Sequence, residues 1–343
     1  MNVEILHGDC RETLKTLPEG SVNCCVTSPP YFGLRDYGHD GQIGLEESPD
    51  AFVQQMVGVF REVKRVLRDD GTLWLNLGDS YAGSGKGRNG DGSVHPSALN
   101  AKQGTSKGTT EGNLKPCRTF RAGAGRADGV VDERAQRNRD GLGPIDGMKP
   151  KDLIGIPWRV AFALQSDGWY LRQDIIWHKP NPMPESVTDR CTKAHEYIFL
   201  LSKSARYFYD AEAIQEEATL RGTTETGDLS YSDGASRNDN SPSSRLRIDR
   251  DSRNRRSVWS VTTKGYKGAH FATFPPDLIR PCILAGCPTG GTVLDPFGGS
   301  GTTGQVAMEE GRKAILCELN ADYVGLIRKR IDGVTPSLFG RAA

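Results

Sequence analysis

The sequence predicts an α/β fold, with a mostly parallel sheet and helices on both of its faces. Short apolar runs alternate along the chain with amphipathic stretches of helical spacing, and this alternation is typical of βαβ units. The clearest unit joins an amphipathic helix over Phe52–Leu67 to a buried strand over Thr72–Leu77. Several strands end in loops rich in glycine or proline, which is where open α/β sheets build their binding sites.

The other elements follow in chain order, separated by residues that end helices and strands. The expected strands are Val3–Leu6, Val22–Val26, one that starts at Trp169 and runs into the proline loop 179–182, His195–Leu201, Arg206–Tyr209, Val293–Leu294 and Lys313–Cys317. The expected helices are Arg11–Leu17, one that begins near Pro157, one with its apolar face over Leu278–Leu284, and Tyr323–Ile331. Because only a short polar link separates His195–Leu201 from Arg206–Tyr209, we expect these two strands to pair as a hairpin at the sheet edge.

The composition indicates one compact domain with long polar additions. The chain has 343 residues, of which 36% are hydrophobic. This length allows a core of roughly 150 to 250 residues plus insertions. Apolar periodicity is lost over 83–148 and again after about residue 211. We therefore divide the chain into 1–82, 83–148, 149–210, 211–269 and 270–343.

Charge and cysteine content narrow the class of protein. The net charge of +1 does not by itself indicate nucleic acid, so a basic surface would have to come from local segregation of charge. The eight cysteines show no metal-like Cys-x-x-Cys pattern, which predicts free thiols in a reducing cytosol and no metal site. The N-terminus has no leader pattern, and no run of about 18 apolar residues occurs. We expect a soluble, cytoplasmic protein.

A glycine-rich stretch near the C-terminus predicts a cofactor site. The apolar run Val293–Leu294 is followed by Asp295-Pro296-Phe297-Gly298-Gly299-Ser300-Gly301 and then by a helical pattern. Such a turn lets the backbone approach a ligand closely, and the next strand ends in Glu318, where nucleotide-binding units place an acid on ribose hydroxyls. A P-loop pattern is absent, and an acid at the strand end repels phosphate but attracts ammonium and sulfonium groups. This favours S-adenosylmethionine.

A second informative turn follows the strand Val22–Val26. It reads Thr27-Ser28-Pro29-Pro30-Tyr31, and its prolines stiffen the loop and cannot donate a backbone N–H. The Ser28 hydroxyl and the Pro29 carbonyl could accept both N–H bonds of an exocyclic amino group, while Tyr31 stacks on an unstacked base. Taken alone, the same five residues are equally consistent with a structural turn.

Arginines are clustered in the second polar segment. Clustered arginine can contact phosphates or guanine edges in the major groove, although a solvated charge run is the competing interpretation. The arginines predicted to contact DNA are Arg245, Arg247, Arg253, Arg255 and Arg256.

Together these motifs resemble those of the DNA amino-methyltransferases, which methylate cytosine N4 or adenine N6. Thr27–Tyr31 resembles the catalytic motif and Asp295–Gly301 the cofactor motif, and their order along the chain resembles the permuted β group. The resemblance implies the S-adenosylmethionine-dependent methyltransferase fold, with a seven-stranded sheet that has one antiparallel strand. It also implies a target-recognition segment at 211–269, between the catalytic half (1–82 and 149–210) and the cofactor half (270–343).

The resemblance implies a role for each matched residue. The implied catalytic residues are Ser28, Pro29, Pro30 and Tyr31, and the implied cofactor-binding residues are Asp9, Phe274, Pro275, Asp295, Phe297, Gly299, Gly301, Thr302 and Glu318. Serine at the first motif position favours cytosine N4, with adenine N6 as the alternative. Methylation of cytosine C5 is disfavoured because it needs a thiolate nucleophile, and the nearest cysteine, Cys282, lies in an apolar helix.

The sequence leaves two alternative functions and two possible partners open. One alternative is an RNA or protein-glutamine methyltransferase, since planar amides also present an NH2 to such an acceptor turn, and a catalytically idle DNA-binding module is another. The expected partner is double-stranded DNA in a bacterial or phage-infected cell, with no membrane. A cognate restriction endonuclease acting separately and a homodimer are both left open.

Overall fold

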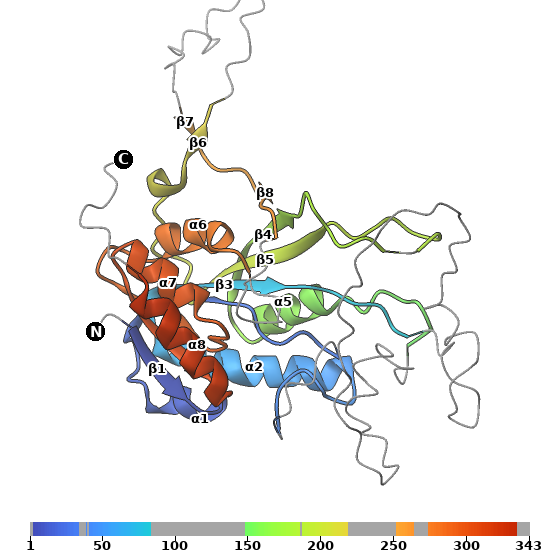
Figure 1. Cartoon of the computed structure of the whole chain (residues 1–343), viewed down its shortest axis with the longest axis horizontal. Coiled ribbons are helices and arrows are strands. Elements are labelled where there is room, and N and C mark those ends of the chain that lie inside the picture. Colours follow the sequence, from blue (N-terminus) through green and yellow to red (C-terminus); the bar gives the residue numbers. More distant parts are fainter. Residues whose placement is uncertain are drawn as a thin grey trace, which may run out of the picture.

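The computed structural model describes residues 3–33, 39, 41–83, 148–185, 187–218, 252–263 and 274–334. These residues form a central eight-stranded sheet of order β1-β10-β9-β2-β3-β5-β4-β8 (Figure 1). Its strands are β1 (Val3–His7), β2 (Val22–Thr27), β3 (Leu67–Leu77), β4 (Tyr170–His178), β5 (His195–Ser202), β8 (Val258–Ser260), β9 (Thr292–Asp295) and β10 (Lys313–Glu318). A separate two-stranded ribbon joins β6 (Glu216–Glu217) to β7 (Ser252–Arg253).

One strand of the sheet runs against the others. β5 is antiparallel to both β3 and β4, whereas all other neighbouring strands are parallel. The single antiparallel strand agrees with the fold predicted from the sequence, but the count is eight instead of seven. The additional strand is β8, a three-residue edge strand that pairs with β4 through Ile176 and Val258. It lies in a polar segment without strand periodicity, where the buried Trp259 holds it against the sheet.

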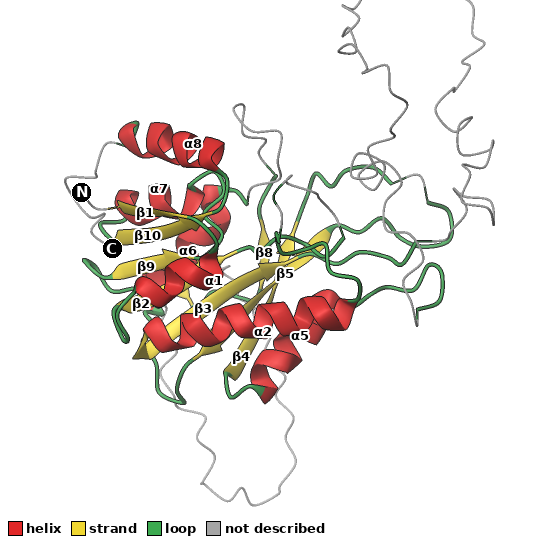
Figure 2. Ribbon diagram, turned by 90° about the horizontal axis from the view of Figure 1, so that it is seen from below, coloured by secondary structure: helices red, strands yellow, loops and turns green. Residues whose placement is uncertain are grey.

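Helices cover both faces, as Figure 2 shows. The helices α1 (Cys10–Thr13), α2 (Pro49–Val66) and α5 (Ile156–Ser166) contribute to one hydrophobic core. The helices α6 (Pro276–Gly286), α7 (Thr302–Glu309) and α8 (Ala321–Asp332) contribute to the other. The 3-10 turns are Leu14–Thr16 and Glu212–Ile214. The α2 helix begins where the Ser48 side chain accepts a hydrogen bond from the Ala51 amide, and its Phe52 and Phe60 are fully buried.

Two local predictions were wrong. The expected hairpin between His195–Leu201 and Arg206–Tyr209 does not form, because β5 bonds to β3 on one side and β4 on the other and 206–209 is not a strand. The strand β5 itself was predicted correctly. Its pairing partners, however, are the neighbouring strands of the sheet and not the next segment of the chain. The second error concerns Asp69–Gly71, which we expected to lie between the helix ending at Leu67 and the strand starting at Thr72. These residues lie within β3, which begins at Leu67 directly after the helix.

The topology places the two motifs side by side. β2 pairs with β9 through Cys24–Val293 and Cys25–Leu294, so segments from opposite ends of the chain are neighbours at the centre of the sheet. Because parallel strands end at the same edge, the Ser28 turn after β2 and the glycine loop after β9 meet there. Both polar segments lie largely outside the described residues, and the domain boundaries stay a prediction. Among the helices described, none is long and apolar enough to cross a membrane.

Candidate active site

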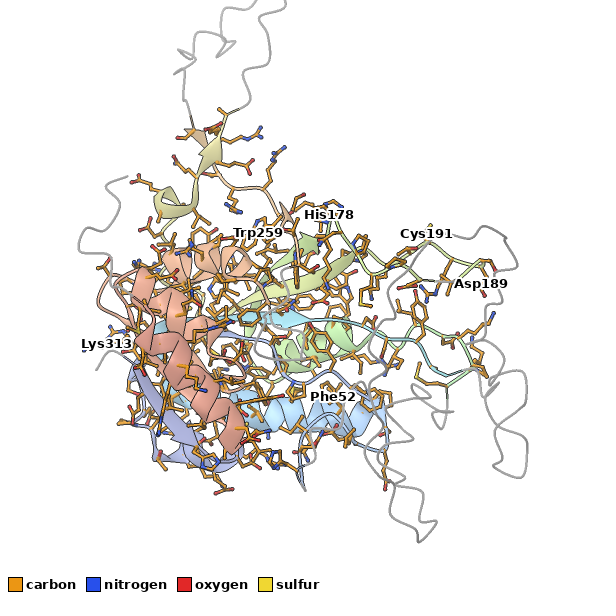
Figure 3. The ribbon with its side chains drawn as sticks, in the orientation of Figure 1. Phe52, His178, Asp189, Cys191, Trp259 and Lys313 are labelled. Carbon is orange, nitrogen blue, oxygen red and sulfur yellow. The ribbon has the colours of Figure 1, made fainter. Side chains whose placement is uncertain are left out.

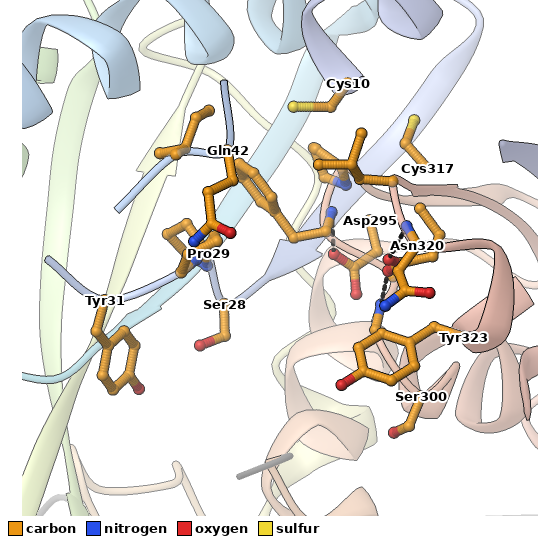
Figure 4. Close-up of a pocket in the computed structure, with 18 of the residues that line it drawn as sticks. Cys10, Ser28, Pro29, Tyr31, Gln42, Asp295, Ser300, Cys317, Asn320 and Tyr323 are labelled. Carbon is orange, nitrogen blue, oxygen red and sulfur yellow. Dashed lines mark hydrogen bonds between the residues drawn. The ribbon is translucent and has the colours of Figure 1, made fainter. Parts of the chain in front are cut away.

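A cavity of about 410 Å³ opens at the carboxyl edge of the sheet. In Figure 4 the Ser28 turn lies on one side of it, and the glycine loop with Asn320 and Tyr323 lies on the other. The lining includes all the predicted catalytic residues and most of the predicted cofactor residues. These are Ser28, Pro29, Pro30, Tyr31, Asp9, Phe274, Asp295, Phe297, Gly299, Thr302 and Glu318. We call the Ser28 side, with Tyr31, Asn76, Lys179 and Glu196, the base wall, and the glycine-loop side, with Asp9 and Glu318, the cofactor wall.

Glu318 organises the cofactor wall. Its Oε2 accepts a hydrogen bond from the Gly299 amide at 2.7 Å, and its Oε1 accepts one from the Asn320 amide at 2.8 Å. Burial raises the pKa of Glu318, and the two amide hydrogen bonds partly oppose this. Each carboxylate oxygen keeps a lone pair, so the group can still accept bonds from the hydroxyls of a ribose.

Two predicted cofactor residues do not line the cavity. Gly301 is the N-cap of α7 at φ 80°, a left-handed conformation, and a side-chain Cβ there would lie 3.0 Å from Ile327. Pro275 is buried at the N-cap of α6. Both residues therefore shape the backbone around the cavity instead of contacting its contents.

The Asp9 carboxylate is held in place by Arg11, the second residue of α1. Its carboxylate caps the helix by accepting from the Arg11 amide and also pairs with the Arg11 guanidinium at 2.5 Å. Burial acts to raise the pKa of Asp9, but the hydrogen bonds and charge of Arg11 outweigh it and lower the pKa below its usual value. Asp9 is therefore ionised at neutral pH beside the cofactor wall.

Asp295 joins the two walls. It is 1% exposed, and its carboxylate accepts hydrogen bonds from Thr27 Oγ1 and Thr303 Oγ1, both at 2.6 Å, and from the Phe297 amide at 3.0 Å. Thr27 immediately precedes Ser28, whereas Thr303 is the second residue of α7. Burial raises the pKa of Asp295, and these three donors act to lower it. The attraction to a sulfonium group stays a prediction, and the geometry adds that Asp295 fixes one motif against the other.

The base wall contains polar residues that sequence reasoning missed. The Tyr31 hydroxyl donates to Glu196 Oε2 at 2.7 Å, and Asn76 Nδ2 donates to the same oxygen at 3.3 Å. Glu196 also forms an ion pair with Lys179. Lys179 lies directly before a proline loop at a strand end, and this position is the signal that could have indicated it.

Cys282 and two histidines at strand ends, His178 and His195, are not part of the cavity lining. Cys282 is 1% exposed within α6, and burial raises the pKa of its thiol, so it cannot serve as an accessible thiolate. His178 lies near Trp259 at the β8 edge (Figure 3) and its Nδ1 is 3.0 Å from the Ser260 hydroxyl. His195 stacks edge-on against Tyr197. Within the described ranges, no group of three or more His, Cys, Asp or Glu residues is placed to hold a metal ion.

The predicted DNA-contacting arginines are only partly described. Arg253 and Arg256 both pair with Glu216, at 2.9 and 2.6 Å, and the Arg255 guanidinium lies 4.8 Å from the centre of the Trp259 ring. Their contacts in this structure are therefore within the chain. Arg245 and Arg247 lie outside the described residues.

An α/β sheet with a single antiparallel strand, and a cavity that places the buried Glu318 carboxylate across from the Ser28 turn, fit the methyltransferase class of enzymes. The sequence comparisons identify the family within this class. The family model for N6/N4 DNA methylases matches residues 22–329, and the chain belongs to this family. The chain is 45% identical over 339 residues to the Type II methyltransferase M.Cfr9I of Citrobacter freundii, covering 99% of this chain and 91% of that relative. It is 43% identical to M.SmaI of Serratia marcescens, covering 96% and 90%.

Solved structures share the fold. The PvuII DNA methyltransferase, described as cytosine-N4-specific, aligns with a TM-score of 0.59 and 18% identity over 100% of this chain and 89% of its own. A Thermus thermophilus protein solved in complex with S-adenosyl-L-methionine aligns with a TM-score of 0.53 and 22% identity, covering 98% of both chains. These likenesses confirm the methyltransferase fold, and the family supports S-adenosylmethionine as the cofactor, as predicted from the sequence.

Proposed function

We propose that this protein transfers a methyl group from S-adenosylmethionine to the exocyclic N4 of a cytosine that has been extruded from double-stranded DNA. The observation that carries the proposal is that Ser28 and Glu318 line one cavity, although 290 positions of the chain separate them. An amino-group acceptor and a nucleoside-binding acid thus face the same space. Methyl transfer from a nucleoside cofactor to an amine requires that juxtaposition.

The cofactor wall fits S-adenosylmethionine. Glu318 offers oxygen acceptors to ribose hydroxyls, and at Gly299 an added Cβ would have only the Phe297 carbonyl within 4 Å, so the backbone there leaves room for a ligand. Asp9 carries a negative charge near the same wall. When bound, S-adenosylmethionine supplies an electrophilic methyl group on a sulfonium. A cavity volume of about 410 Å³ lies in the usual range for ligand sites.

The base wall aligns the nucleophile. Ser28 Oγ and the Pro29 carbonyl accept the two N–H bonds of the amino group and turn its lone pair out of conjugation. Tyr31 stacks on the extruded base, and this contact offsets part of the free-energy cost of unstacking that base from the duplex. The nitrogen gains the methyl group and afterwards releases one proton to solvent, so no covalent enzyme intermediate is needed.

The preference for cytosine N4 over adenine N6 rests on Ser28. In the family resemblance, serine at this motif position is associated with cytosine and aspartate with adenine. Arg245, Arg247, Arg253, Arg255 and Arg256 are proposed to contact DNA, and Arg253 and Arg256 would then exchange their pairing with Glu216 for phosphates. A restriction endonuclease that acts separately belongs to the same proposal, because similar proteins are Type II methyltransferases. A homodimer stays a prediction.

A product assay tests the proposal without knowledge of the recognition sequence. Unmodified bacterial genomic DNA is incubated with the protein and methyl-labelled S-adenosylmethionine, digested to nucleosides and analysed by mass spectrometry. We expect N4-methyldeoxycytidine. N6-methyldeoxyadenosine would overturn the choice of base, and label on RNA or protein in parallel incubations, with none on DNA, would overturn the proposal altogether.

The Ser28→Ala and Pro29→Ala variants test the assigned roles. Loss of one acceptor hydrogen bond in the transition state is expected to lower kcat about ten- to a hundredfold. Affinity for S-adenosylmethionine, measured by calorimetry, should change less than twofold. An equal loss of turnover and of cofactor affinity would count against the roles given to this turn.

A further inference from the structure

The base wall contains an ion pair for which the reaction described above has no use. Lys179 and Glu196 are paired with side chains only 19% and 15% exposed, and both line the cavity that contains Ser28. Partly desolvated pairs contribute little net stability, because the desolvation penalty offsets the Coulombic gain. Their placement in a ligand cavity therefore calls for a functional reason.

Glu196 fixes the positions of its neighbours. Its Oε2 accepts from Tyr31 at 2.7 Å and from Asn76 at 3.3 Å, and its Oε1 pairs with Lys179. The Tyr31 ring is held from its other side by Gly78, where an added Cβ would lie 2.5 Å from the ring. The carboxylate is thus shared by three donors and is not itself available as a strong acceptor for a base.

Lys179 remains able to bind a ligand. Its ammonium has three N–H donors, of which one reaches Glu196, and the described residues supply no second acceptor. The nitrogen lies 4.4 Å from the centre of the Trp177 ring, which also lines the cavity. A cation held between a carboxylate and an aromatic face has a restricted orientation, so it can distinguish between ligands.

We propose that Lys179 is a specificity-determining residue that donates to the O2 and N3 edge of the extruded cytosine, and that Glu196 is the positioning residue that holds it there. This inference rests on the proposed function of the Ser28 turn. Cytosine presents its amino group, N3 and O2 along one edge, so acceptors at one end and a cation at the other complement it. Adenine has a ring nitrogen beside its amino group but no carbonyl at the next position, so the cation gains less from it.

The first test compares Lys179→Met with the matched control Lys313→Met, which removes an exposed charge outside the cavity lining, at the start of β10 and therefore at the strand end opposite to Glu318. The substrate is unmodified bacterial genomic DNA, and the readouts are kcat/KM for DNA, the ratio of N4-methyldeoxycytidine to N6-methyldeoxyadenosine, and calorimetric affinity for S-adenosylmethionine. For Lys179→Met we expect kcat/KM to fall about ten- to a hundredfold, the size of a lost charge-assisted hydrogen bond, and the cytosine to adenine ratio to fall. Cofactor affinity should stay within twofold, and Lys313→Met should match the wild type.

Conservative variants separate recognition from folding. Lys179→Arg keeps the charge and donors and should retain more activity on DNA than Lys179→Met. Glu196→Gln should raise KM for DNA more than it lowers kcat, because it loosens Lys179 and Tyr31 without touching the methyl donor. The double variant Lys179→Met/Glu196→Gln should bind S-adenosylmethionine as the wild type does, since it leaves no unpaired charge in the wall.

The outcomes distinguish this inference from the proposed function. If the wild type yields N4-methyldeoxycytidine and Lys179→Met keeps kcat/KM within threefold, the role of Lys179 is wrong and the function stands. If Lys179→Met loses cofactor affinity as strongly as activity, the residue is structural and the inference fails. If the wild type yields only N6-methyldeoxyadenosine, both the choice of cytosine and the proposed reading of its edge are overturned.

Discussion

The two walls of the cavity are built in different ways. Most of the cofactor wall is local: Glu318 bonds to the amides of Gly299 and Asn320, which come from the strand–loop–helix units at the C-terminal end of the chain, and only Asp9 joins it from the N-terminal end, where β1 pairs with β10. The base wall is assembled from distant segments, since Tyr31, Asn76 and Glu196 come from three different parts of the sheet. Asp295 connects the two through Thr27 and Thr303.

This difference separates binding of the cofactor from selection of the target base. A wall held by backbone amides has a fixed geometry and suits a cofactor that is the same in every turnover. A wall held by side chains from separate strands can change its donors and acceptors without altering the cofactor site. We therefore expect substitutions in the cofactor wall to weaken cofactor binding and substitutions in the base wall to lower kcat/KM for DNA. Substitution of Asp295, the junction between the two walls, should weaken both.

The largest effect is expected at the junction, in Asp295→Ala. The change leaves the Thr27 and Thr303 hydroxyls and the Phe297 amide without their buried acceptor. We expect the free energy of unfolding to fall by about 2 to 4 kcal/mol and binding of S-adenosylmethionine to be abolished. Urea denaturation and calorimetry measure these, with the exposed Glu19→Ala as control. Normal stability and affinity in Asp295→Ala would contradict the role of the junction.

The next effect is confined to the cofactor wall. In Glu318→Gln the amide oxygen replaces a carboxylate that accepts from Gly299 and Asn320, so the charge-assisted bonds to the loop and to a ribose weaken. The dissociation constant for S-adenosylmethionine should rise about ten- to a hundredfold. DNA binding, measured by fluorescence anisotropy, should stay unchanged. An equal loss of DNA affinity would show that the walls are not independent.

A smaller effect is expected from Gly78→Ala in the base wall. The added methyl group would lie 2.5 Å from the Tyr31 ring, so the ring must shift away from its bond to Glu196. We expect kcat/KM for DNA to fall about tenfold through the misplaced ring. Affinity for S-adenosylmethionine should not change.

Gly58→Ala is the matched control for this substitution. Gly58 lies in α2 and has no atom within 4 Å of an added Cβ. It should therefore stabilise the protein by about 0.5 to 1 kcal/mol while leaving kinetics unaltered. If Gly78→Ala and Gly58→Ala give the same kcat/KM for DNA, the packing of Tyr31 against Gly78 does not affect the reaction.

The smallest effect concerns pH. Burial raises the pKa of Glu318 above its ordinary value of 4.5, so its carboxylate becomes protonated at a higher pH than an exposed glutamate would. Only the ionised form accepts hydrogen bonds through both oxygens, so affinity for S-adenosylmethionine is present above the raised pKa and declines as the pH falls through it. Calorimetry across this range should show the decline in the wild type and a flatter profile in Glu318→Gln. Parallel profiles would exclude Glu318 as the titrating group.

The two walls were also not equally predictable from the sequence. The loop Asp295–Gly301, Glu318 and the Ser28 turn are contiguous or closely spaced motifs whose chemistry is evident from residue type, and the structure brings them to one cavity. The partners of Tyr31 could not be predicted in this way. Glu196 faces it only because β5 pairs with β3, and that pairing depends on the whole sheet.

The wrong hairpin has the same cause. Local spacing favoured Arg206–Tyr209 as the partner of β5, but two long neighbours, β3 and β4, offer more hydrogen bonds and a larger apolar surface. The packing constraint on Gly301 could not be predicted for a related reason. A glycine in a cofactor motif indicates a constraint on the backbone, and only the position of Ile327 shows that packing imposes it here.

The most direct test of the central claim uses a bisubstrate compound in which cytosine N4 is linked by two carbons to the sulfur of S-adenosylhomocysteine. If the two walls face each other across one cavity, the compound binds with one-to-one stoichiometry and more tightly than S-adenosylhomocysteine, and both Ser28→Ala and Glu318→Gln weaken it. If it binds no more tightly than S-adenosylhomocysteine, and only Glu318→Gln weakens it, the two motifs do not form one active site.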